Sequence, residues 1–599
     1  MRKLAAWIIV LGLACAPLVR ADGTKDGKSA DGTTKPATTD STKSDTDKNA
    51  AKPAAKSDAP PSSAELASEI EQLRALLKEQ ADQMAAQEAE LASLKATMTH
   101  GNSTLAGAQP STASSTAVVA NAVSGAPANG SAPVASASNA VPTPDPAVGA
   151  PAQNDTGTHS PLSFKIGDAQ FTPLGFMDFT TVYRTTGTGA GIGSSFGSIP
   201  FNNNYPTAGV GELRFSAQNS RVGIRVDAPV GSAKITGYLE ADFLGAIAQN
   251  ANVTSNSDSL RMRVYFGDYR RGNWEILGGQ DWSLLTPNRK GLSPFPSDIF
   301  YSQDMDTNYQ VGLTWSRQPQ FRVMYHAGDA WTFGVSAENP DALLTTAVAT
   351  PAAFSPYAGE LDATSGGTLA TPPTPNYVPD IIVKIANDSK VGDKLFHIEG
   401  AGLFSEFRLF TPSAVTTTTN MTRTAAGGGV SVNANLELFK NFHLIANTFY
   451  SDGGGRYIFG LGPDLAVKQA TTTSPFVPSP VHAASGIGGI EYQATKSSFL
   501  DFYYGAAWYG RDVIVNPVSG LSNLGYGFSG SSSSDNRAIQ EYTVGWTQTF
   551  WQNPNYGKLQ LITQGSYLTR APWFLSAVTG TPRDAHLFMV YLDLRYVLP

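Results

Sequence analysis

The sequence predicts an all-β transmembrane barrel of about 16 antiparallel strands, preceded by an α-helical coiled coil and disordered linkers. Three observations predict this fold class: apolar and polar residues alternate through most of the chain, short turns alternate with long loops, and an apolar row ends the chain. Beyond the N-terminus, no stretch reaches the roughly eighteen apolar residues of a membrane helix, so strands must cross the membrane. A soluble all-β protein would also contain single strands in which apolar and polar residues alternate. It would not be expected to repeat this pattern through most of the chain up to the C-terminus.

Residues 1–21 have the pattern of a signal peptide. Arg2 and Lys3 are followed by an apolar run, and Val19-Arg20-Ala21 forms a small-residue cleavage site. Cys15 is the only cysteine, and the Leu that lipidation requires three residues earlier is absent, because Gly12 stands there. The mature chain is therefore expected to begin near Asp22 without disulfide or thiolate chemistry.

Residues 22–61 form a polar tail that is too poor in apolar residues to fold. A coiled coil is predicted over residues 62–99, where Ser62 and Glu65 form a capping box. Its core positions repeat every four and three residues: Leu66, Ile70, Leu73, Leu77, Gln80, Met84, Gln87, Leu91, Leu94 and Met98. The heptads leave dimer and trimer open, and the alternative is a lone amphipathic helix lying on another surface. An Ala/Ser/Pro-rich linker follows over residues 100–160.

The barrel is predicted over residues 161–599. Short connections are expected at 229–232, 270–273, 327–330, 387–393, 439–442, 495–498 and 552–557. Long loops are expected near 186–209, 246–258, 281–308, 339–376, 406–426, 451–485, 510–536 and 569–585. An even number of strands results if 309–326 is one strand, because Val311, Leu313 and Trp315 share a parity with Phe321, Val323 and Tyr325.

The last strand is predicted to carry the assembly signal that the barrel-assembly machinery reads. Its apolar row contains Phe588, Val590, Leu592, Leu594, Tyr596 and Leu598. Asp593 and Arg595 have the opposite parity, so we expect them to face the lumen. This strand should close the barrel by pairing with the strand near Phe176. The terminal Pro599 departs from the Phe with which many barrels end.

A charged constriction is predicted inside the barrel. The third long loop, 281–308, is compact enough in composition to fold inward and carries Asp298, Asp304 and Asp306. Arginines on the polar parity of neighbouring strands would face this loop, with a bulge near Asn219: Arg214, Arg221, Arg225, Arg261 and Arg263. Such an arrangement can select ions. The alternative is that these residues form ion pairs that stiffen the wall.

The sequence predicts no enzyme, catalytic residue, cofactor or metal site. Residues 304–308 resemble the start of a calcium loop but lack its later Gly and Glu, since Tyr309 and Trp315 stand at those positions. Residues 193–197 have the spacing of a nucleophile elbow within a Gly-rich loop that no helix follows. The net charge of −7 gives no basic domain for nucleic acid.

Aromatic residues near strand ends are predicted to form interfacial girdles. They are Trp274, Trp315, Trp331, Trp508, Tyr509, Trp546, Phe550, Trp551 and Tyr596. The alternative is that they pack in the core of a soluble β-protein.

The order of signal, heptads, linker and large barrel resembles the DcaP-like trimeric porins. The local resemblance lies in GFMDF (175–179), SAQNSRVGIRV (216–226), GYLEADFLG (237–245), LRMRVYFGDYR (260–270), GGQDWSLLTP (278–287) and the terminal LRYVLP. It implies a homotrimer in the bacterial outer membrane, with a sixteen-stranded barrel and a periplasmic coiled coil. It also implies passage of small hydrophilic solutes, with a preference for dicarboxylates.

The expected function is therefore a porin that forms a water-filled channel for passive diffusion of small hydrophilic solutes, chiefly anions. Expected partners are outer-membrane lipid and lipopolysaccharide, and the inward arginines fit an anion preference. The alternative is a structural anchor that joins the envelope to peptidoglycan through the tail and coiled coil. A barrel lipase is a third class, for which the sequence shows no convergent Ser and His. A trimeric adhesin is disfavoured, because this chain can close a barrel alone.

Overall fold

The computed structural model describes residues 160–188, 190–201, 207–245, 259–299, 305, 309–345, 347–360, 376–460, 462–575 and 584–599. All of these belong to the second of two compact units, 123–599. The predicted signal peptide, tail, coiled coil and all of the linker except Ser160 lie outside the described residues. No helix among the described residues has the length and apolar composition needed to cross a membrane.

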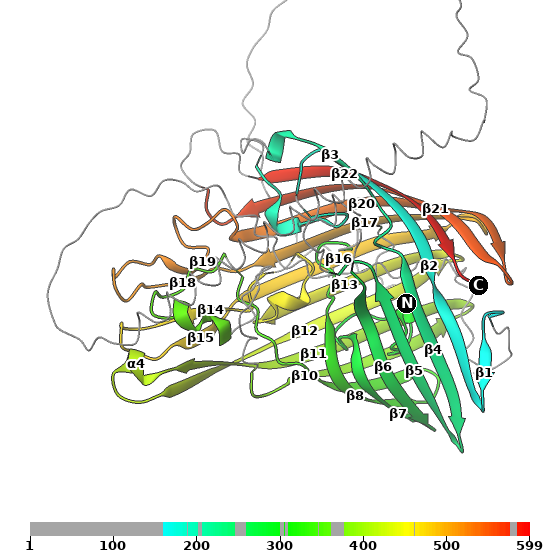
Figure 1. Cartoon of the computed structure of the whole chain (residues 1–599), viewed down its shortest axis with the longest axis horizontal. Coiled ribbons are helices and arrows are strands. Elements are labelled where there is room, and N and C mark those ends of the chain that lie inside the picture. The colour runs from blue at the N-terminus through cyan, green and yellow to red at the C-terminus, as the bar shows by residue number, and fades with distance from the viewer. Residues whose placement is uncertain are drawn as a thin grey trace, which may run out of the picture. The chain divides into compact units, whose positions relative to one another are not determined.

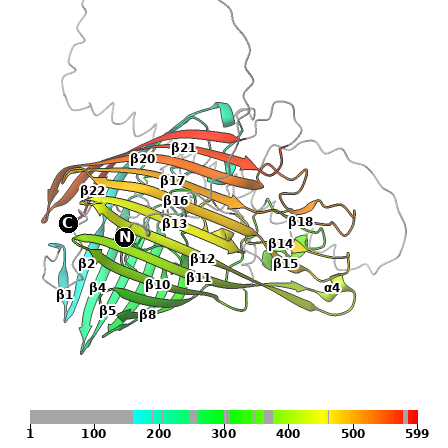
Figure 2. The ribbon, with the colours of Figure 1, turned by 180° about the vertical axis from the view of Figure 1, so that it is seen from behind.

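The described strands form a closed antiparallel barrel (Figure 1, Figure 2). In chain order its strands are β2 (Ala169–Arg184), β3 (Glu212–Ser216), β4 (Arg221–Val230), β5 (Ala233–Asp242), β6 (Arg261–Arg271), β7 (Trp274–Trp282), β8 (Arg317–Ala327), β9 (Trp331–Glu338), β10 (Asp380–Val391), β11 (Lys394–Thr411), β12 (Met421–Phe439), β13 (Phe442–Asp452), β16 (His482–Gln493), β17 (Ser498–Tyr509), β20 (Asn536–Asn553), β21 (Gly557–Pro572) and β22 (Ala585–Val597). Both β3 and β4 pair with β2 and share one position, so the barrel has sixteen strand positions among the described residues. The predicted fold class is confirmed.

Smaller elements decorate the two rims. On the short-turn rim, β1 (Phe164–Ile166) forms a hairpin with β2. On the long-loop rim, β14 (Leu465–Lys468) pairs with β15 (Val477–Pro480), and β18 (Asp512–Ile514) pairs with β19 (Leu524–Tyr526). The described helices are short: η1 (Phe196–Ser198), η2 (Thr207–Gly209), η3 (Pro296–Asp298), η4 (Ser355–Glu360), α4 (Ser413–Thr416) and η5 (Gly455–Tyr457).

Short turns and long loops lie at opposite ends of the barrel, as expected. Figure 1 shows β14, β15, β18, β19 and α4 at one end and the turns of β4/β5 and β6/β7 at the other. Gly231 and Gly272 occupy two of these turns with φ values of 59° and 58°, a left-handed conformation that glycine adopts readily. The loop between β11 and β12 is shorter than expected, since both strands extend into the predicted loop 406–426.

The alternation of faces is confirmed along single strands. In β22 the row from Phe588 to Leu594 is exposed, whereas Asp593 and Arg595 are buried inside. The same holds for β5, where Ile235 and Leu239 face outward. The outward rows are apolar enough to lie in lipid, and the inward rows carry the polar and charged residues.

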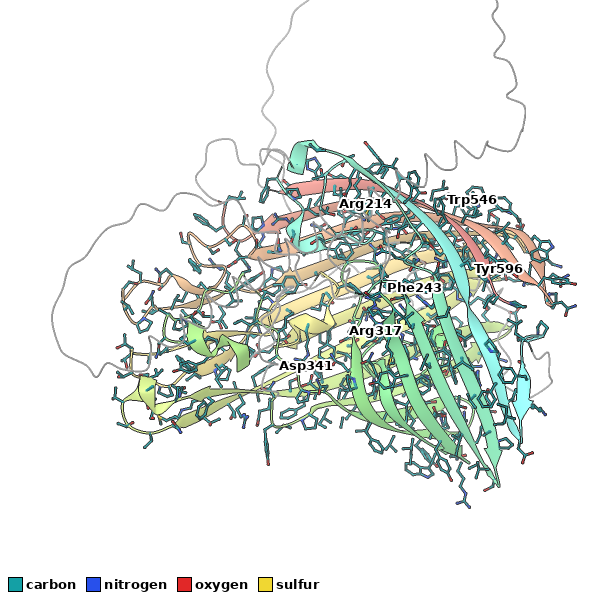
Figure 3. All side chains as sticks on the ribbon, viewed as in Figure 1. Arg214, Phe243, Arg317, Asp341, Trp546 and Tyr596 are labelled. Carbon is teal, nitrogen blue, oxygen red and sulfur yellow. The ribbon has the colours of Figure 1, made fainter. Side chains whose placement is uncertain are left out.

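Most of the predicted girdle residues do lie on the outer surface. Trp546 and Tyr596, labelled in Figure 3, belong to the outward rows of β20 and β22. Trp315 and Tyr509 are exceptions, since both side chains are buried inside. A position near the end of a strand was therefore not enough to distinguish aromatic residues on the outer surface from those that pack inside the barrel.

The predicted strand 309–326 is wrong in its first half. Strand β8 begins at Arg317, and residues 309–316 lie in a loop inside the barrel. Two residues there have a left-handed backbone, Tyr309 with φ 59° and Gly312 with φ 85°, which is incompatible with a regular strand. The predicted even number of strands is still correct, because β8 alone spans the barrel wall between β7 and β9.

The bulge expected near Asn219 is present as a break between β3 and β4. Ser220 N donates to the carbonyl of Ala217 over 3.0 Å, which closes a turn across the break. The side chain of Asn219 donates to Asp178 on β2 over 3.2 Å. This turn shifts the parity of the inward arginines between the two halves of the strand.

Strands β2 and β22 close the barrel, with Phe176 paired to Val597 as expected. Leu598 N donates to Gly175 O over 3.1 Å, and Ser160 Oγ donates to Pro599 O over 2.7 Å. Gly175 has φ 143°, and a Cβ there would lie 2.2 Å from Arg221 O, so only glycine fits this close approach. The first and last residues of the barrel therefore meet at the short-turn rim.

Candidate functional site

The described residues of the segment 283–316, which are 283–299, 305 and 309–316 and are hereafter called the lumenal loop, lie inside the barrel. Its backbone amides donate to carboxylates from separate strands: Leu284 N to Glu338 on β9 over 2.8 Å and Asn288 N to Glu399 on β11 over 2.8 Å. Further along, Val311 N donates to Glu541 on β20 over 2.9 Å. These contacts attach the lumenal loop to the wall on several sides.

Charged side chains reinforce the first half of the loop. Arg289 makes a two-point ion pair with Glu491 on β16, at 2.7 and 2.8 Å. Lys384 on β10 donates to Thr286 O over 2.7 Å and forms an ion pair with Glu399 over 2.8 Å. Because the lysine, Glu399 and the loop backbone are buried together, each partner compensates the desolvation of the others.

The second half of the lumenal loop packs closely against β13, β16 and β17. Thr314 N donates to Asn447 on β13 over 2.9 Å. A Cβ on Gly312 would lie 2.3 Å from Ala506 O and 2.6 Å from Gly486 O. The long loop after β13 also enters here, because Trp315 N donates to Tyr457 O over 2.8 Å.

Aromatic rings form the apolar centre of this packing. The rings of Trp282 and Trp315 lie 3.8 Å apart between centroids, and those of Tyr309 and Trp315 lie 4.9 Å apart. Phe459, from the loop after β13, is 6.0 Å from Tyr309. The predicted inward-folding loop thus extends further than 281–308, since Asp281 and Trp282 end β7 and the loop continues to Ser316.

The predicted acidic face of the loop is only partly described. The carboxylate of Asp298 accepts from Ser293 Oγ over 2.7 Å, within the loop itself. Asp304 and Asp306 lie outside the described residues. Asp298 thus has a hydrogen-bond partner within the loop and also interacts electrostatically with Lys290 and with Arg225, one of the predicted arginines.

All five predicted arginines have carboxylate partners: Arg221, Arg261 and Arg263 pair across neighbouring strands, whereas Arg214 and Arg225 each pair with an acid two residues away on the same strand. The ion pairs are Arg214–Glu212 at 2.9 Å, Arg221–Glu240 at 3.3 Å, Arg225–Asp227 at 2.7 Å, Arg261–Asp242 at 2.5 Å and Arg263–Glu240 at 2.5 Å. Side-chain exposure divides them into two groups. Arg214, Arg225 and Arg261 remain 44%, 20% and 15% exposed, whereas Arg221 and Arg263 are almost completely buried.

Aromatic rings orient several guanidinium groups. Arg225 lies over Phe295 of the lumenal loop at 4.4 Å, and both Arg221 and Arg595 lie over Phe176, at 5.0 and 4.3 Å. Arg317, labelled in Figure 3, lies 5.1 Å from Trp282. The contacts with Phe176 and Trp282 hold their arginines against the wall, whereas the contact with Phe295 joins Arg225 to the lumenal loop.

Sequence reasoning missed most of the residues that hold the lumenal loop. The wall carboxylates are Glu338, Glu399, Glu491 and Glu541, and the basic residues are Arg289 and Lys384. The sequence held one signal for these residues: an acidic residue at an inward-facing position of a strand. A buried carboxylate requires a hydrogen-bonding or charged partner. The identity of that partner depends on a distant loop and carries no local signal.

No group of three or more potential metal-ligating side chains is found in the part of the chain that the structure describes. The sequence offered no candidate cofactor site either.

Residues 149–310 match the family model described as DcaP outer membrane protein. No curated protein is similar enough in sequence to be matched. Solved structures that are similar include the outer membrane channel DcaP of Acinetobacter baumannii, with 17% identity, a TM-score of 0.49, and coverage of 72% of this chain and 99% of that chain. An anion-selective porin from Comamonas acidovorans has 11% identity and a TM-score of 0.38, with coverage of 72% and 99%. The trimer form of OmpT from Vibrio cholerae has 9% identity and a TM-score of 0.37, also with coverage of 72% and 99%.

The predicted resemblance to the DcaP family is confirmed over the matched segment, which includes β2 to β7 and most of the lumenal loop. Together with the closed sixteen-position barrel and its apolar outer surface, this match indicates an outer-membrane protein with a porin-like barrel.

Proposed function

We propose that the chain forms a passive channel for small hydrophilic anions, in which the lumenal loop narrows the passage. The observation that carries the proposal is the position of the lumenal loop, anchored to β9, β11, β16 and β20 inside a sixteen-position barrel. A barrel of this size encloses an aqueous lumen unless protein occupies part of it. The anchored loop would therefore set the width available to a solute.

Anion preference is supported by the partially exposed arginines. Arg214, Arg225 and Arg261 keep guanidinium surface available beside their carboxylate partners. A guanidinium binds a carboxylate through two parallel hydrogen bonds, which suits dicarboxylates among small anions. Arg221 and Arg263 would act through the structure of the wall, since their ion pairs exclude solvent.

Single-channel recording of the full mature chain in a planar bilayer tests this function. We expect discrete open steps and a reversal potential that indicates anion preference under a salt gradient. The double substitution R225Q/R261Q should reduce that preference, because it removes two accessible positive charges from the lumen. R423Q removes a charge from the long hairpin of β12 and should leave the reversal potential almost unchanged.

Correctly folded protein without open steps would overturn the channel and favour the structural anchor. An unchanged reversal potential in R225Q/R261Q would remove these two residues from selectivity. Adding R263Q extends the test, but the loss of Arg263 leaves Glu240 without its shortest ion pair. Folding of that variant must therefore be checked by its resistance to SDS at room temperature.

We further propose that the protein is a homotrimer that the predicted coiled coil supports. Apolar outward rows of the barrel can bury surface against another copy as well as against lipid. Deletion of residues 62–98 should lower the temperature at which the trimer dissociates on a native gel while leaving the trimer intact at room temperature. A monomer at room temperature would show that the coiled coil is required for assembly.

A further inference from the structure

Two arginines contact one tryptophan ring at the long-loop rim. Arg511, which follows β17, has its Cζ 4.9 Å from the centroid of the Trp573 ring, and Arg537, in β20, has its Cζ 5.9 Å from the same ring. Both arginines are exposed, whereas Trp573 is half-buried. We call these three residues the rim clamp. Two guanidinium groups are thereby held close to a single indole.

The rim clamp is fixed by contacts on several sides. Trp573 Nε1 donates to Tyr509 O over 2.9 Å, and Trp573 N donates to Asp535 O over 2.9 Å. Gly527 has φ 71°, and a Cβ there would lie 2.7 Å from both Arg511 Cγ and Trp573 Cδ1. The backbone of the β19–β20 connection therefore closes against the clamp, which limits its rotation.

The clamp lies directly above an outward aromatic row. The ring of Trp573 meets that of Trp508 edge-on at 6.4 Å, and Trp508 belongs to the outward row of β17. Tyr504 and Tyr542 continue that outward surface on β17 and β20, with ring centroids 4.8 Å apart. Outward aromatic residues mark the boundary between hydrocarbon and headgroups, so the guanidinium groups lie at headgroup depth.

Neither guanidinium is neutralised by a described carboxylate. The nearby acid Asp512 forms its ion pair with Lys468 at 3.5 Å. Asp535 is buried, and its carboxylate accepts from Gly527 N over 2.5 Å. The inward arginines of the barrel differ sharply, because each predicted one has an acidic partner on the wall. Within the described part of the rim, Arg511 and Arg537 are thus two exposed positive charges without an ion pair to a carboxylate.

We propose that Arg511 and Arg537 bind a phosphate carried by a lipid of the outer leaflet, with the acyl chains of that lipid along the outward row below. Guanidinium groups form charge-assisted, bidentate hydrogen bonds with phosphate oxygens. A ring that holds two such groups in place reduces the rotamer freedom lost on binding. The ligand class is a phosphorylated glycolipid, because long-loop rims of such barrels face the outer leaflet.

Binding of lipopolysaccharide to the purified full-length oligomer in neutral detergent tests the proposal. Native mass spectrometry or microscale thermophoresis would compare the wild type with R511Q/R537Q. We expect the double variant to bind about tenfold or more weakly, since it loses the charge-assisted hydrogen bonds from both guanidinium groups to the phosphate. R423Q is the matched control, because Arg423 is also exposed near the long-loop rim but lies on β12, which β13 and β16 separate from β17. It should bind as the wild type does.

Two further probes identify the ligand group. Enzymatically dephosphorylated lipopolysaccharide should bind the wild type as weakly as intact lipopolysaccharide binds the double variant. Inorganic phosphate at millimolar concentration should not displace the lipid, because it lacks acyl chains. Displacement by phosphate would overturn the lipid assignment in favour of a soluble anion, and equal affinity of wild type and R511Q/R537Q would overturn the site. Channel conductance in neutral lipid should be unchanged in R511Q/R537Q, so this test is independent of the channel proposal.

Discussion

Arg289 of the lumenal loop and Glu491 of β16 form a bidentate ion pair, with N–O distances of 2.7 and 2.8 Å. Glu491 also accepts a hydrogen bond from Tyr503 Oη over 2.9 Å. A residue of the barrel wall therefore helps to orient the carboxylate that binds the loop. The loop residue is partly exposed, at 20%, whereas the carboxylate is buried. This pair attaches the first half of the lumenal loop to β16 through two charge-assisted hydrogen bonds.

Breaking this ion pair should release the first half of the lumenal loop. In R289Q the loop loses its charged contact with β16, so we expect a larger and noisier single-channel conductance. K290Q is the matched control, because it removes the same charge from the neighbouring position and leaves the Arg289–Glu491 pair intact. Identical conductance in R289Q and the wild type would mean that residues 286–291 do not border the solute path.

The second half of the loop should depend on Gly312. Alanine there would place a Cβ 2.3 Å from Ala506 O and would require a left-handed backbone at φ 85°. We expect G312A to displace residues 309–316 and to alter conductance without preventing barrel closure, since no barrel strand includes this position. The control G267A lies in β6, where a Cβ meets nothing within 4 Å. An unaltered G312A channel would contradict the close packing against β16 and β17.

The barrel seam should depend more on Arg595 than on Asp178. These residues form a fully buried ion pair at 2.7 Å across β22 and β2, and Asp593 lies 3.2 Å from the same guanidinium. Removing one partner of a buried pair costs about 3–5 kcal/mol. R595M leaves two buried carboxylates facing each other, so it should lower the urea midpoint of unfolding more than D178N does. A larger loss in D178N would contradict this assignment of the seam.

Asp535 should make the stability of the long-loop rim depend on pH. Burial raises the pKa of Asp535 to about 6, against an ordinary value of 3.8. The folded protein therefore holds this proton more tightly, and its contribution to stability is complete below pH 3.8 and is lost as pH rises through about 6. We expect D535N to melt at a higher temperature than the wild type at pH 7 and at nearly the same temperature at pH 4. Circular dichroism at both pH values measures this, and a difference that does not depend on pH would contradict it.

The wall of the barrel could be predicted from the sequence because lipid imposes one rule on every strand. Each outward position must be apolar, which gives a period of two and marks the faces of β5, β12 and β22 without tertiary information. The turn residues Gly231 and Gly272 gave the strand ends for a similar local reason. The break near Asn219 was also predictable, since a change of parity within one strand requires an extra residue.

The interior could not be predicted in the same way. Val311, Leu313 and Trp315 alternate like a strand because one side of the lumenal loop packs on aromatic rings while the other bonds to polar wall residues. A buried loop and a half-buried strand therefore produce the same pattern. Gly312 was the only local sign of irregular backbone, and the partners Glu541 and Asn447 lie more than a hundred residues away.

The hydrogen bond from Ser160 Oγ to Pro599 O places the first and last residues of the barrel next to each other. A peptide linker of a few residues between these ends, with a new opening in a long loop, would give a circularly permuted chain with the same strand neighbours. Stability alone therefore does not dictate which strand is synthesised last.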